Sequence, residues 1–311
     1  MMEFVEDVKI PIAAWVEWVV DWILDNLQPL LDAISAAIGA VSTTLEDFLL
    51  WLHPFVLAGA LVLIGLWRVN WKFAVFVAVS MLLIMGMNLW EETISTMALV
   101  VAAAFVALVV GFPVGVAMAK NDTVEAIVRP VLDFMQTMPP FVYLIPAAMF
   151  FGLGKVPGTI ATVIFAMPPA VRLTNLGIRQ VSTENVEAGL AFGCTDRQLL
   201  TKVQLPLALP SIMAGVNQTI MLALSMVVIA SMIGAGGLGN VVLTGIQRLN
   251  VGLGFEGGLG VVIVAILLDR LTQSIGQVGH GEGVIAKVRR LLGGSQPVAE
   301  DDQETKTSRA A

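Results

Sequence analysis

The sequence ISTMALVVAAAFVALVVGFPVGVAMA occupies residues 94–119 and contains no charged side chain. A helix needs roughly 20 apolar residues to cross the hydrocarbon core of a bilayer, which is about 30 Å thick. This stretch is long enough, so it predicts a helix that crosses a membrane. The composition agrees, because 57% of the residues are hydrophobic, only 13% are charged and the mean hydropathy is +0.85. We therefore expect an all-α integral membrane protein.

Seven stretches are apolar enough to be membrane spans. The fourth is short and rich in proline, which is tolerated where protein rather than lipid surrounds the backbone, so the expected range is six to seven spans. No basic segment followed by a short apolar run and a small-residue cleavage site precedes the first span, so no signal peptide is expected. The predicted spans are residues 49–67, 73–90, 94–119, 140–153, 156–178, 207–233 and 259–277.

The distribution of lysine and arginine predicts the orientation, because these residues accumulate on the cytoplasmic side of membrane proteins. With seven spans, 14 of the 17 lie on one side of the membrane, and the other 3 are Lys9, Lys155 and Arg248. This asymmetry predicts an N-terminus outside the cell membrane and a cytoplasmic C-terminus. The connection at residues 180–206 is then cytoplasmic.

Four segments follow from these patterns. Residues 1–48 are predicted to be an acidic periplasmic segment with an amphipathic helix, residues 49–91 peripheral transmembrane helices, residues 92–278 the core, and residues 279–311 a cytoplasmic, partly disordered tail. Helices that lie on anionic lipid carry lysine or arginine on their polar face, and this one is acidic, so we favour packing on the outer rim of the protein over lipid contact. Its acidic stripe is Glu17, Asp21, Asp25 and Asp32, opposite Trp15, Val19 and Ile23.

Several site classes are disfavoured by composition. The formal net charge of -7 argues against nucleic-acid binding. A single cysteine, Cys194, excludes a disulfide within the chain and a thiolate metal site. His53 and His280 lie far apart, with no carboxylates at ligand-like spacing. We therefore predict no metal site and no catalytic residue.

The cytoplasmic connection is predicted to fold as helix, turn, helix. A hydroxyl at residues 182–183 can cap the first helix, and Gly193 can end it in the left-handed conformation. Thr195, followed three residues later by Gln198, is a capping-box pattern that starts the second helix. Pro206 disfavours helix at the residue before it and is predicted to end that helix.

Apolar residues line one face of each predicted loop helix. Val186, Leu190 and Gly193 share a face of the first, and Leu199 and Val203 share a face of the second. A compact knob of this kind suits a groove on a partner protein.

The same connection resembles the signature loop of bacterial ABC importer permeases, E-A-A-x3-G-x9-I-x-L-P. Two positions depart conservatively, a glycine in place of the second alanine and a valine in place of the isoleucine. The resemblance implies that this loop receives the motion of an ATPase. The matching residues are Glu187, Ala188, Gly189, Gly193, Val203, Leu205 and Pro206.

The resemblance extends over residues 92–277 and is strongest to the permease of glycine betaine/proline betaine importers, the ProW type. Three stretches carry it: RPVLDFMQTMPP at 129–140, VQLPLALPSIMAGVNQTI at 203–220 and ALSMVVIASMIGAGGLG at 223–239. It implies a MetI-like core in the bacterial inner membrane and a permease homodimer. The other implied partners are two cytoplasmic ATP-binding subunits and a periplasmic protein that delivers a quaternary ammonium osmolyte. Glycine betaine, proline betaine, choline and carnitine all stay open as cargo.

The chain contains no G-x-x-x-x-G-K-[ST] phosphate-binding loop, so we expect no cofactor here and ATP with magnesium on the partner ATPase. An ion-gradient-driven secondary transporter is the alternative. Such carriers usually show carboxylates at mid-membrane and inverted repeats, and neither is evident. A purely structural scaffold would not need a capped loop that matches a coupling motif.

Candidate residues of the substrate path are polar or polarizable groups within the matching stretches. Their alternative role is hydrogen bonding and packing between helices. All 7 tryptophans precede the matching core, mostly near span ends, where an interfacial belt is the simpler interpretation. We therefore expect the delivery protein to select the ligand. The candidates are Met135, Gln136, Asn217, Gln218 and Ser225.

Overall fold

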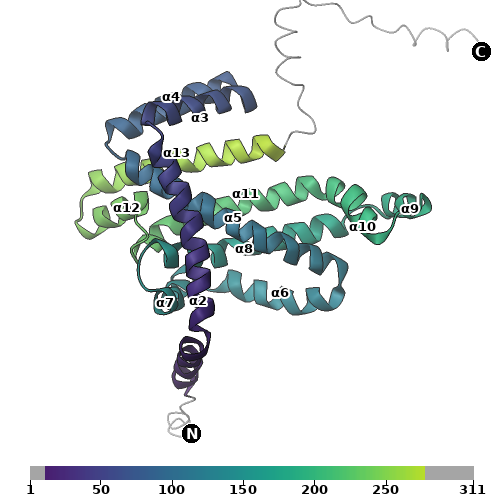
Figure 1. Cartoon of the computed structure of the whole chain (residues 1–311). Helices are drawn as coiled ribbons and strands as arrows, with labels where there is room; N and C mark the ends of the chain where they lie inside the picture. The colour runs from purple at the N-terminus through teal and green to yellow at the C-terminus, as the bar shows by residue number, and fades with distance from the viewer. Residues whose placement is uncertain (1–10, 277–311) are drawn as a thin grey trace, which may run out of the picture. The chain divides into compact units, whose positions relative to one another are not determined.

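The computed structural model describes residues 11–276, and every regular element among them is helical (Figure 1). The predicted all-α class is confirmed, whereas the predicted tail at 279–311 lies outside the described residues. The helices are α2 Ile12–Trp51, α3 Pro54–Arg68, α4 Trp71–Gly86, α5 Trp90–Lys120, α6 Asp122–Thr137, α7 Pro140–Phe151, α8 Lys155–Arg179, α9 Thr183–Ala191, α10 Asp196–Gln198, the π-helix η1 Leu199–Gln204, α11 Leu205–Ser231, α12 Gly237–Gln247 and α13 Val251–Gly276.

Three long helices, α5, α8 and α11, form the centre of the bundle, with α8 packed against both of the others. Of the most apolar stretch of α8, 67% is buried. Glycines allow the backbones to approach: a Cβ atom at Gly115 of α5 would lie 2.7 Å from the carbonyl oxygen of Val171 on α8. Small residues at helix contacts are typical of membrane bundles, where close packing replaces the hydrophobic effect.

The number of candidate spans reaches only the lower end of the predicted range of six to seven. By length and composition, five described helices can cross a membrane, or six if α6 and α7, which meet at 102°, together form one bent span. The predicted short, proline-rich fourth span is α7. Helices α3 and α4 have 15 and 16 residues. At 1.5 Å per residue each is about 23 Å long, which is shorter than the hydrocarbon thickness.

Some boundaries also differ from the predictions. The first predicted span, 49–67, ran across a break, because α2 continues to Trp51 and Pro54 then begins α3. Pro54 disfavours a helical conformation at the residue before it, which separates the two helices. The last predicted span began at residue 259, whereas α13 begins at Val251. The glycines of its first turns lower the hydropathy without preventing the helix.

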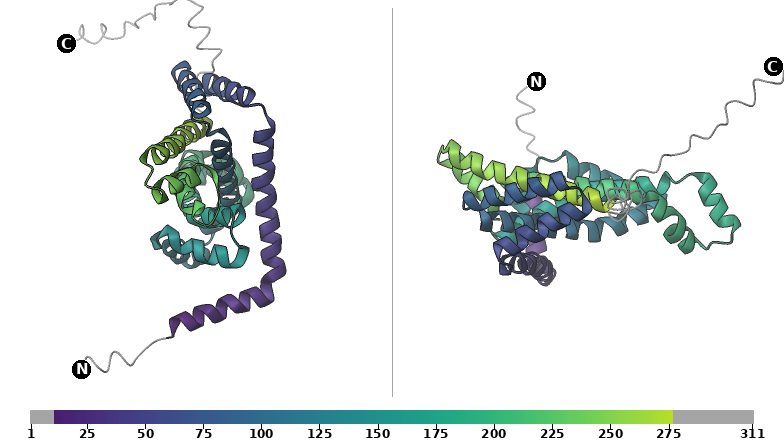
Figure 2. Two further views of the ribbon diagram at one scale, coloured as in Figure 1. Left: turned by 90° about the vertical axis from the view of Figure 1, so that its left-hand side faces the viewer. Right: turned by 90° about the horizontal axis from the view of Figure 1, so that it is seen from above.

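Helix α2 is the longest element, with 40 residues. The predicted amphipathic helix is therefore only its first part. Figures 1 and 2 show that α2 runs across the axes of α5, α8 and α11 rather than along them. Pro29 lies inside α2, and Figure 2 shows the helix changing direction part-way along its length. Proline removes a backbone hydrogen bond and commonly bends a helix in this way.

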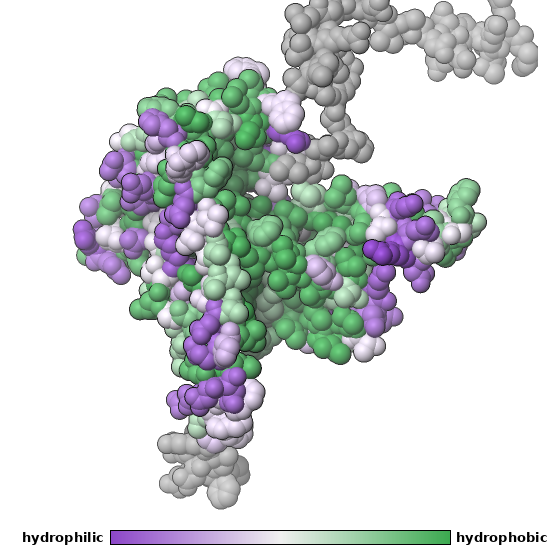
Figure 3. All heavy atoms as spheres, in the orientation of Figure 1, coloured by the Kyte–Doolittle hydropathy of each residue, from purple (hydrophilic) through white to green (hydrophobic). Residues whose placement is uncertain are grey.

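The outer surface of the bundle is broadly apolar, as Figure 3 shows for one face. Exposed apolar side chains include Val79 and Leu82 of α4 and Phe105 and Val109 of α5. In water such a surface would be unfavourable, whereas hydrocarbon tails solvate it well.

Candidate functional site

The connection between α8 and α11 is a folded loop that extends beyond the end of the bundle (Figure 1). The predicted helix, turn, helix pattern is confirmed, but the predicted hydroxyl cap is not: Ser182 is the N-cap residue of α9 and its side chain makes no capping hydrogen bond. Gly193 follows α9 with a φ of 77°, in the left-handed region that glycine adopts most easily. Thr195 and Gln198 form the predicted capping box: the Thr195 N–H donates to Gln198 Oε1 at 3.0 Å, and the Gln198 N–H donates to Thr195 Oγ1 at 3.4 Å.

The predicted helix end at Pro206 is wrong. The chain continues through the π-helix η1 into α11 without a break, and Pro206 lies in the first turn of α11. The Leu205 N–H donates to the Leu200 carbonyl, five residues back. The wider π turn leaves room for the proline ring, which would clash with an ordinary helical turn. The loop is therefore a direct extension of α11.

The two halves of the loop pack together at Gly189. A Cβ atom at this position would lie 2.8 Å from Leu199 Cδ1 and 3.5 Å from Val203 Cγ2. Glycine instead of alanine thus lets η1 approach α9 closely. Leu199 is buried and Val203 half-buried, so the apolar face predicted for the second loop helix packs within the loop rather than standing free, whereas Leu190 is 50% exposed.

The base of the loop is held by the ends of α8 and α11. Leu200 of η1 packs with Ile178 of α8 and Ala208 of α11 in one buried cluster. The two helices also meet closely at Gly177, where a Cβ atom would lie 2.8 Å from the Cβ of Ser211. The loop is therefore packed against both helices.

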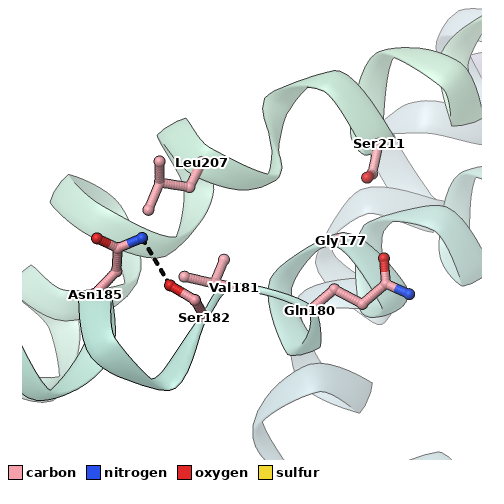
Figure 4. A pocket seen from close by; sticks show the side chains of 7 residues that line it. All are labelled: Gly177, Gln180, Val181, Ser182, Asn185, Leu207 and Ser211. Atoms are coloured by element: carbon pink, nitrogen blue, oxygen red, sulfur yellow. Dashed lines mark hydrogen bonds between the residues drawn. The ribbon is translucent and has the colours of Figure 1, made fainter.

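A groove of about 320 Å³ lies beside this base (Figure 4). Within it the Asn185 side chain donates from Nδ2 to Ser182 Oγ at 2.9 Å, which holds the start of α9. The other lining residues come from α8, from the connection between α8 and α9, and from α11, so the groove lies at the junction of the loop and the bundle. Its full lining is Gly177, Gln180, Val181, Ser182, Asn185, Leu207 and Ser211.

Arg179, at the end of α8, ties three helices together next to the loop. Its guanidinium donates to Asp122 Oδ1 at 2.6 Å and lies 3.0 Å from Glu125 Oε2, both on α6. It also donates to the Met118 carbonyl of α5 at 2.8 Å. Asp122 and Glu125 therefore balance the positive charge of the Arg179 guanidinium.

Within residues 11–276 no group of three or more His, Cys, Asp or Glu side chains is arranged to hold a metal ion.

The remaining residues of the signature loop lie on its outer surface or at its junction with α11. Glu187 and Ala188 are exposed on α9, and no ion pair of Glu187 occurs within the described part of the chain. Leu205 is half-buried against the cluster at the base. Pro206 is exposed at the start of α11.

The candidate path residues lie on two helices, α6 and α11. Within the described residues, no hydrogen bond joins the candidates on α6 to those on α11. Gln218 and Ser225 are exposed on α11, and Ser225 Oγ donates to the Met221 carbonyl of its own helix at 3.0 Å. Asn217 Oδ1 is buried and accepts no hydrogen bond from the described residues. Gln136 is exposed on α6, whereas Met135 packs into a cluster with Met118 and Leu132.

Residues 111–277 match the family model described as "Binding-protein-dependent transport system inner membrane component". The chain belongs to this family. The match covers α8, the whole loop and α11, and it disfavours the ion-gradient-driven alternative. It begins within α5, so α2, α3 and α4 lie outside it.

Curated relatives cover more of the chain. It is 50% identical over 281 residues to the glycine betaine/carnitine transport permease protein GbuB of Listeria monocytogenes, covering 88% of this chain and 98% of the relative. It is 46% identical to the glycine betaine/proline betaine permease ProW of Escherichia coli, covering 88% and 77%. It is 45% identical to the glycine betaine permease OpuAB of Bacillus subtilis, covering 86% and 95%.

Solved structures agree on the fold. A chain of the MetNI methionine ABC transporter superposes with a TM-score of 0.55 at 22% identity and covers 59% of this chain and 92% of its own length. The expected MetI-like core and the multi-pass inner-membrane character of this transport-system component are therefore confirmed.

Sequence reasoning missed one residue of the family's loop. Phe192 is 89% exposed at the turn between α9 and α10. Phe192 precedes Gly193, which ends the first loop helix, and it belongs to neither of the two predicted apolar faces. An apolar residue outside those faces is the sequence signal that could have pointed to it. Figure 3 shows hydrophilic residues gathered over the loop, with an apolar area toward its far end.

Proposed function

We propose that the chain is the permease subunit of an ATP-driven importer of a quaternary ammonium osmolyte. The observation that carries the proposal is the folded loop, which extends from the bundle and is held by α8 and α11 through Leu200. The relatives named for glycine betaine, proline betaine and carnitine support this cargo class. Choline belongs to the same chemical class.

In this proposal the loop connects a cytoplasmic ATPase to the bundle. Leu190 and Phe192 expose apolar area that fits a groove on the ATPase, as helical motifs do in other complexes. Because the loop is continuous with α11 and packs on α8, motion of the ATPase would shift both helices together and change access to the membrane interior. ATP and magnesium would be held by the ATP-binding subunits.

The proposed assembly contains two permeases, two ATP-binding subunits and a periplasmic binding protein. Gln218, Met221 and Ser225 form an exposed stripe on α11, at the spacing of one helix face. We expect this stripe to face the second permease and to line the path between the two copies. Asn217 Oδ1 is buried and accepts no hydrogen bond from the described residues, so it is not part of this exposed stripe.

In this proposal the binding protein, rather than the permease, selects the cargo. Quaternary ammonium groups have no hydrogen-bond donors and are commonly held by aromatic faces. The tryptophans of this chain all lie at or before Trp90, and most are exposed on α2, α3 and α4, away from α11. The core at 92–277 therefore lacks tryptophan, the side chain whose ring holds a cation best.

Reconstitution tests the proposal. The permease, its ATPase and its binding protein are placed in vesicles, and uptake of labelled glycine betaine is measured. We expect uptake to require ATP and the binding protein and to persist when ionophores remove proton and sodium gradients. Uptake that follows an imposed ion gradient without ATP would contradict the proposal. Exchange of the binding protein should change the cargo, whereas unchanged selectivity would place recognition in this chain.

A further inference from the structure

Helix α2 has the length and composition of a membrane span but not the direction of one. Its apolar stretch Ala14–Trp51 has 38 residues, and only 6% of the most apolar part is buried. Figures 1 and 2 show its axis running across the axes of α5, α8 and α11. If those three helices cross the bilayer, α2 lies along it. The apolar surface of α2 therefore needs an explanation other than crossing.

The contacts between α2 and the first turns of α8 show at which end of the bundle α2 lies. The Lys155 ammonium donates to both carboxylate oxygens of Glu46, at 2.5 and 2.7 Å. Ser42 Oγ lies 3.5 Å from Thr159 Oγ1, and both side chains are buried. Since α8 leads from Lys155 to the loop at its other end, α2 lies at the end of the bundle opposite the loop. A lysine at a helix end is typical of a membrane interface.

The first part of α2, residues 14–28, extends past the bundle in Figure 1 and carries three exposed tryptophans on one face. Trp15, Trp18 and Trp22 are 60%, 68% and 49% exposed, at spacings of three and four residues. At 100° per residue, this stripe lies between an acidic stripe and the apolar stripe of the helix. Tryptophan prefers such a boundary in lipid, where the ring contacts hydrocarbon and the N–H contacts headgroups. The acidic stripe is Glu17, Asp21 and Asp25, and the apolar stripe includes Val16, Val19 and Ile23.

The contact between α2 and α5 leaves space for a lipid chain. An apolar groove of about 590 Å³ lies between them, lined by Val41, Leu45 and Phe48 of α2 and by Val101 and Phe105 of α5. Thr44 is the only polar side chain among its lining residues. An acyl chain fits this lining, because a groove facing hydrocarbon needs no hydrogen-bonding occupant.

We propose that α2 lies in the membrane plane, at the interface where α8 begins, and that residues 14–28 rest on lipid through the three tryptophans, in place of the rim packing that the sequence favoured for this segment. The described part of α2 contains no lysine or arginine and has six acidic side chains. The surface it rests on is therefore zwitterionic lipid, because anionic headgroups would repel this helix. This inference depends on the membrane bundle and not on the cargo or the ATPase.

Sidedness of single cysteines gives the first test. In a Cys194→Ser background, Glu17→Cys and Asp47→Cys are reacted with a membrane-impermeant maleimide in sealed vesicles of known orientation. Leu153→Cys, just before α8, marks the near side, and Phe192→Cys in the loop marks the far side. We expect positions 17 and 47 to react from the same side as position 153. Reaction of position 17 from the side of position 192 would mean that α2 crosses the membrane and would overturn the proposal.

Lipid contact gives the second test, with a nitroxide spin label at Trp18→Cys and a matched label at Asp21→Cys in phosphatidylcholine vesicles. We expect the ratio of oxygen to nickel-chelate collisions to be several-fold higher at position 18 than at position 21. Replacing part of the lipid with phosphatidylglycerol should lower that ratio, because anionic headgroups repel the acidic helix. Equal ratios at both positions would mean that the helix stands in water. Low collision with both reagents and spin–spin coupling between permeases would assign this face to the second copy. Either result would overturn the proposal, and neither depends on uptake.

Discussion

Two parts of the protein extend from the packed bundle, the loop of α9, α10 and η1 and the first part of α2, and they are held in different ways. The loop has its own turn, capping box and internal packing at Gly189, and Leu200 fastens it to two bundle helices. Residues 14–28 of α2 have exposed tryptophans, while the inter-helix hydrogen bonds of α2 lie further along, at Ser42 and Glu46. A part that transmits force needs internal rigidity, whereas a part that lies on lipid can be shaped by the membrane.

The largest effect is expected from Gly193→Val, because a β-branched residue resists the left-handed conformation at a cost of roughly 1–2 kcal/mol or more. The loop would then misalign while the bundle stays intact. We expect loss of uptake with normal abundance in the membrane. Asn adopts this conformation more readily, so Gly193→Asn is the matched control and should retain most uptake. Full uptake by the valine variant would remove the loop from the coupling mechanism.

The next largest effect is expected from Phe192→Ala at the loop surface. If this ring enters a groove on the ATPase, its removal should cost roughly 2 kcal/mol, or about thirtyfold in affinity. Binding of the purified ATP-binding subunit to the permease in nanodiscs measures it. Leu82→Ala, on the exposed surface of α4, is the control and should leave that affinity unchanged. Equal affinities of both variants would show that the ring lies outside the contact.

A smaller effect is expected from Thr195→Ala, which removes the capping box at the start of α10. Loss of an N-cap side chain typically costs about 1 kcal/mol. Hydrogen exchange of the Gln198 and Leu199 amides, which donate to Thr195, should accelerate by roughly fivefold, since 1.4 kcal/mol corresponds to tenfold. The Thr201 hydroxyl of η1 donates to the Arg197 carbonyl of α10 and does not cap the helix start, so Thr201→Ala should change these rates little. Unchanged exchange in Thr195→Ala would mean that packing at Gly189 alone orders the loop.

The smallest effect is expected from substitutions in the ion pair between Glu46 of α2 and Lys155 of α8. The Lys155 side chain is 43% exposed, so solvent screening limits its pair with Glu46 to about 1 kcal/mol or less. A double-mutant cycle with Glu46→Gln and Lys155→Met, followed by thermal unfolding in detergent, measures this coupling. ATPase binding should not change in either variant. A change there would show that the two extended parts communicate through α8.

The predictions that depend on a few neighbouring residues were the reliable ones. The turn at Gly193 and the cap at Thr195 were predicted correctly because each depends on residues within one turn of chain. Pro206 was predicted wrongly, since its steric clash can be relieved either by ending the helix or by widening the turn before it. Packing of Leu200 in the bundle keeps the chain helical there, and no local pattern contains that contact.

The sequence by itself determined the membrane class, the apolar helices of the core and the signature loop, because hydropathy, caps and motif spacing are properties of neighbouring residues. Tertiary structure alone decided that α2 lies across the bundle, although its composition is that of a span. It also decided that Gly189 joins the loop halves and that Phe192 remains exposed. Direction, close approach and exposure depend on contacts between residues distant in the chain, which a hydropathy pattern does not contain.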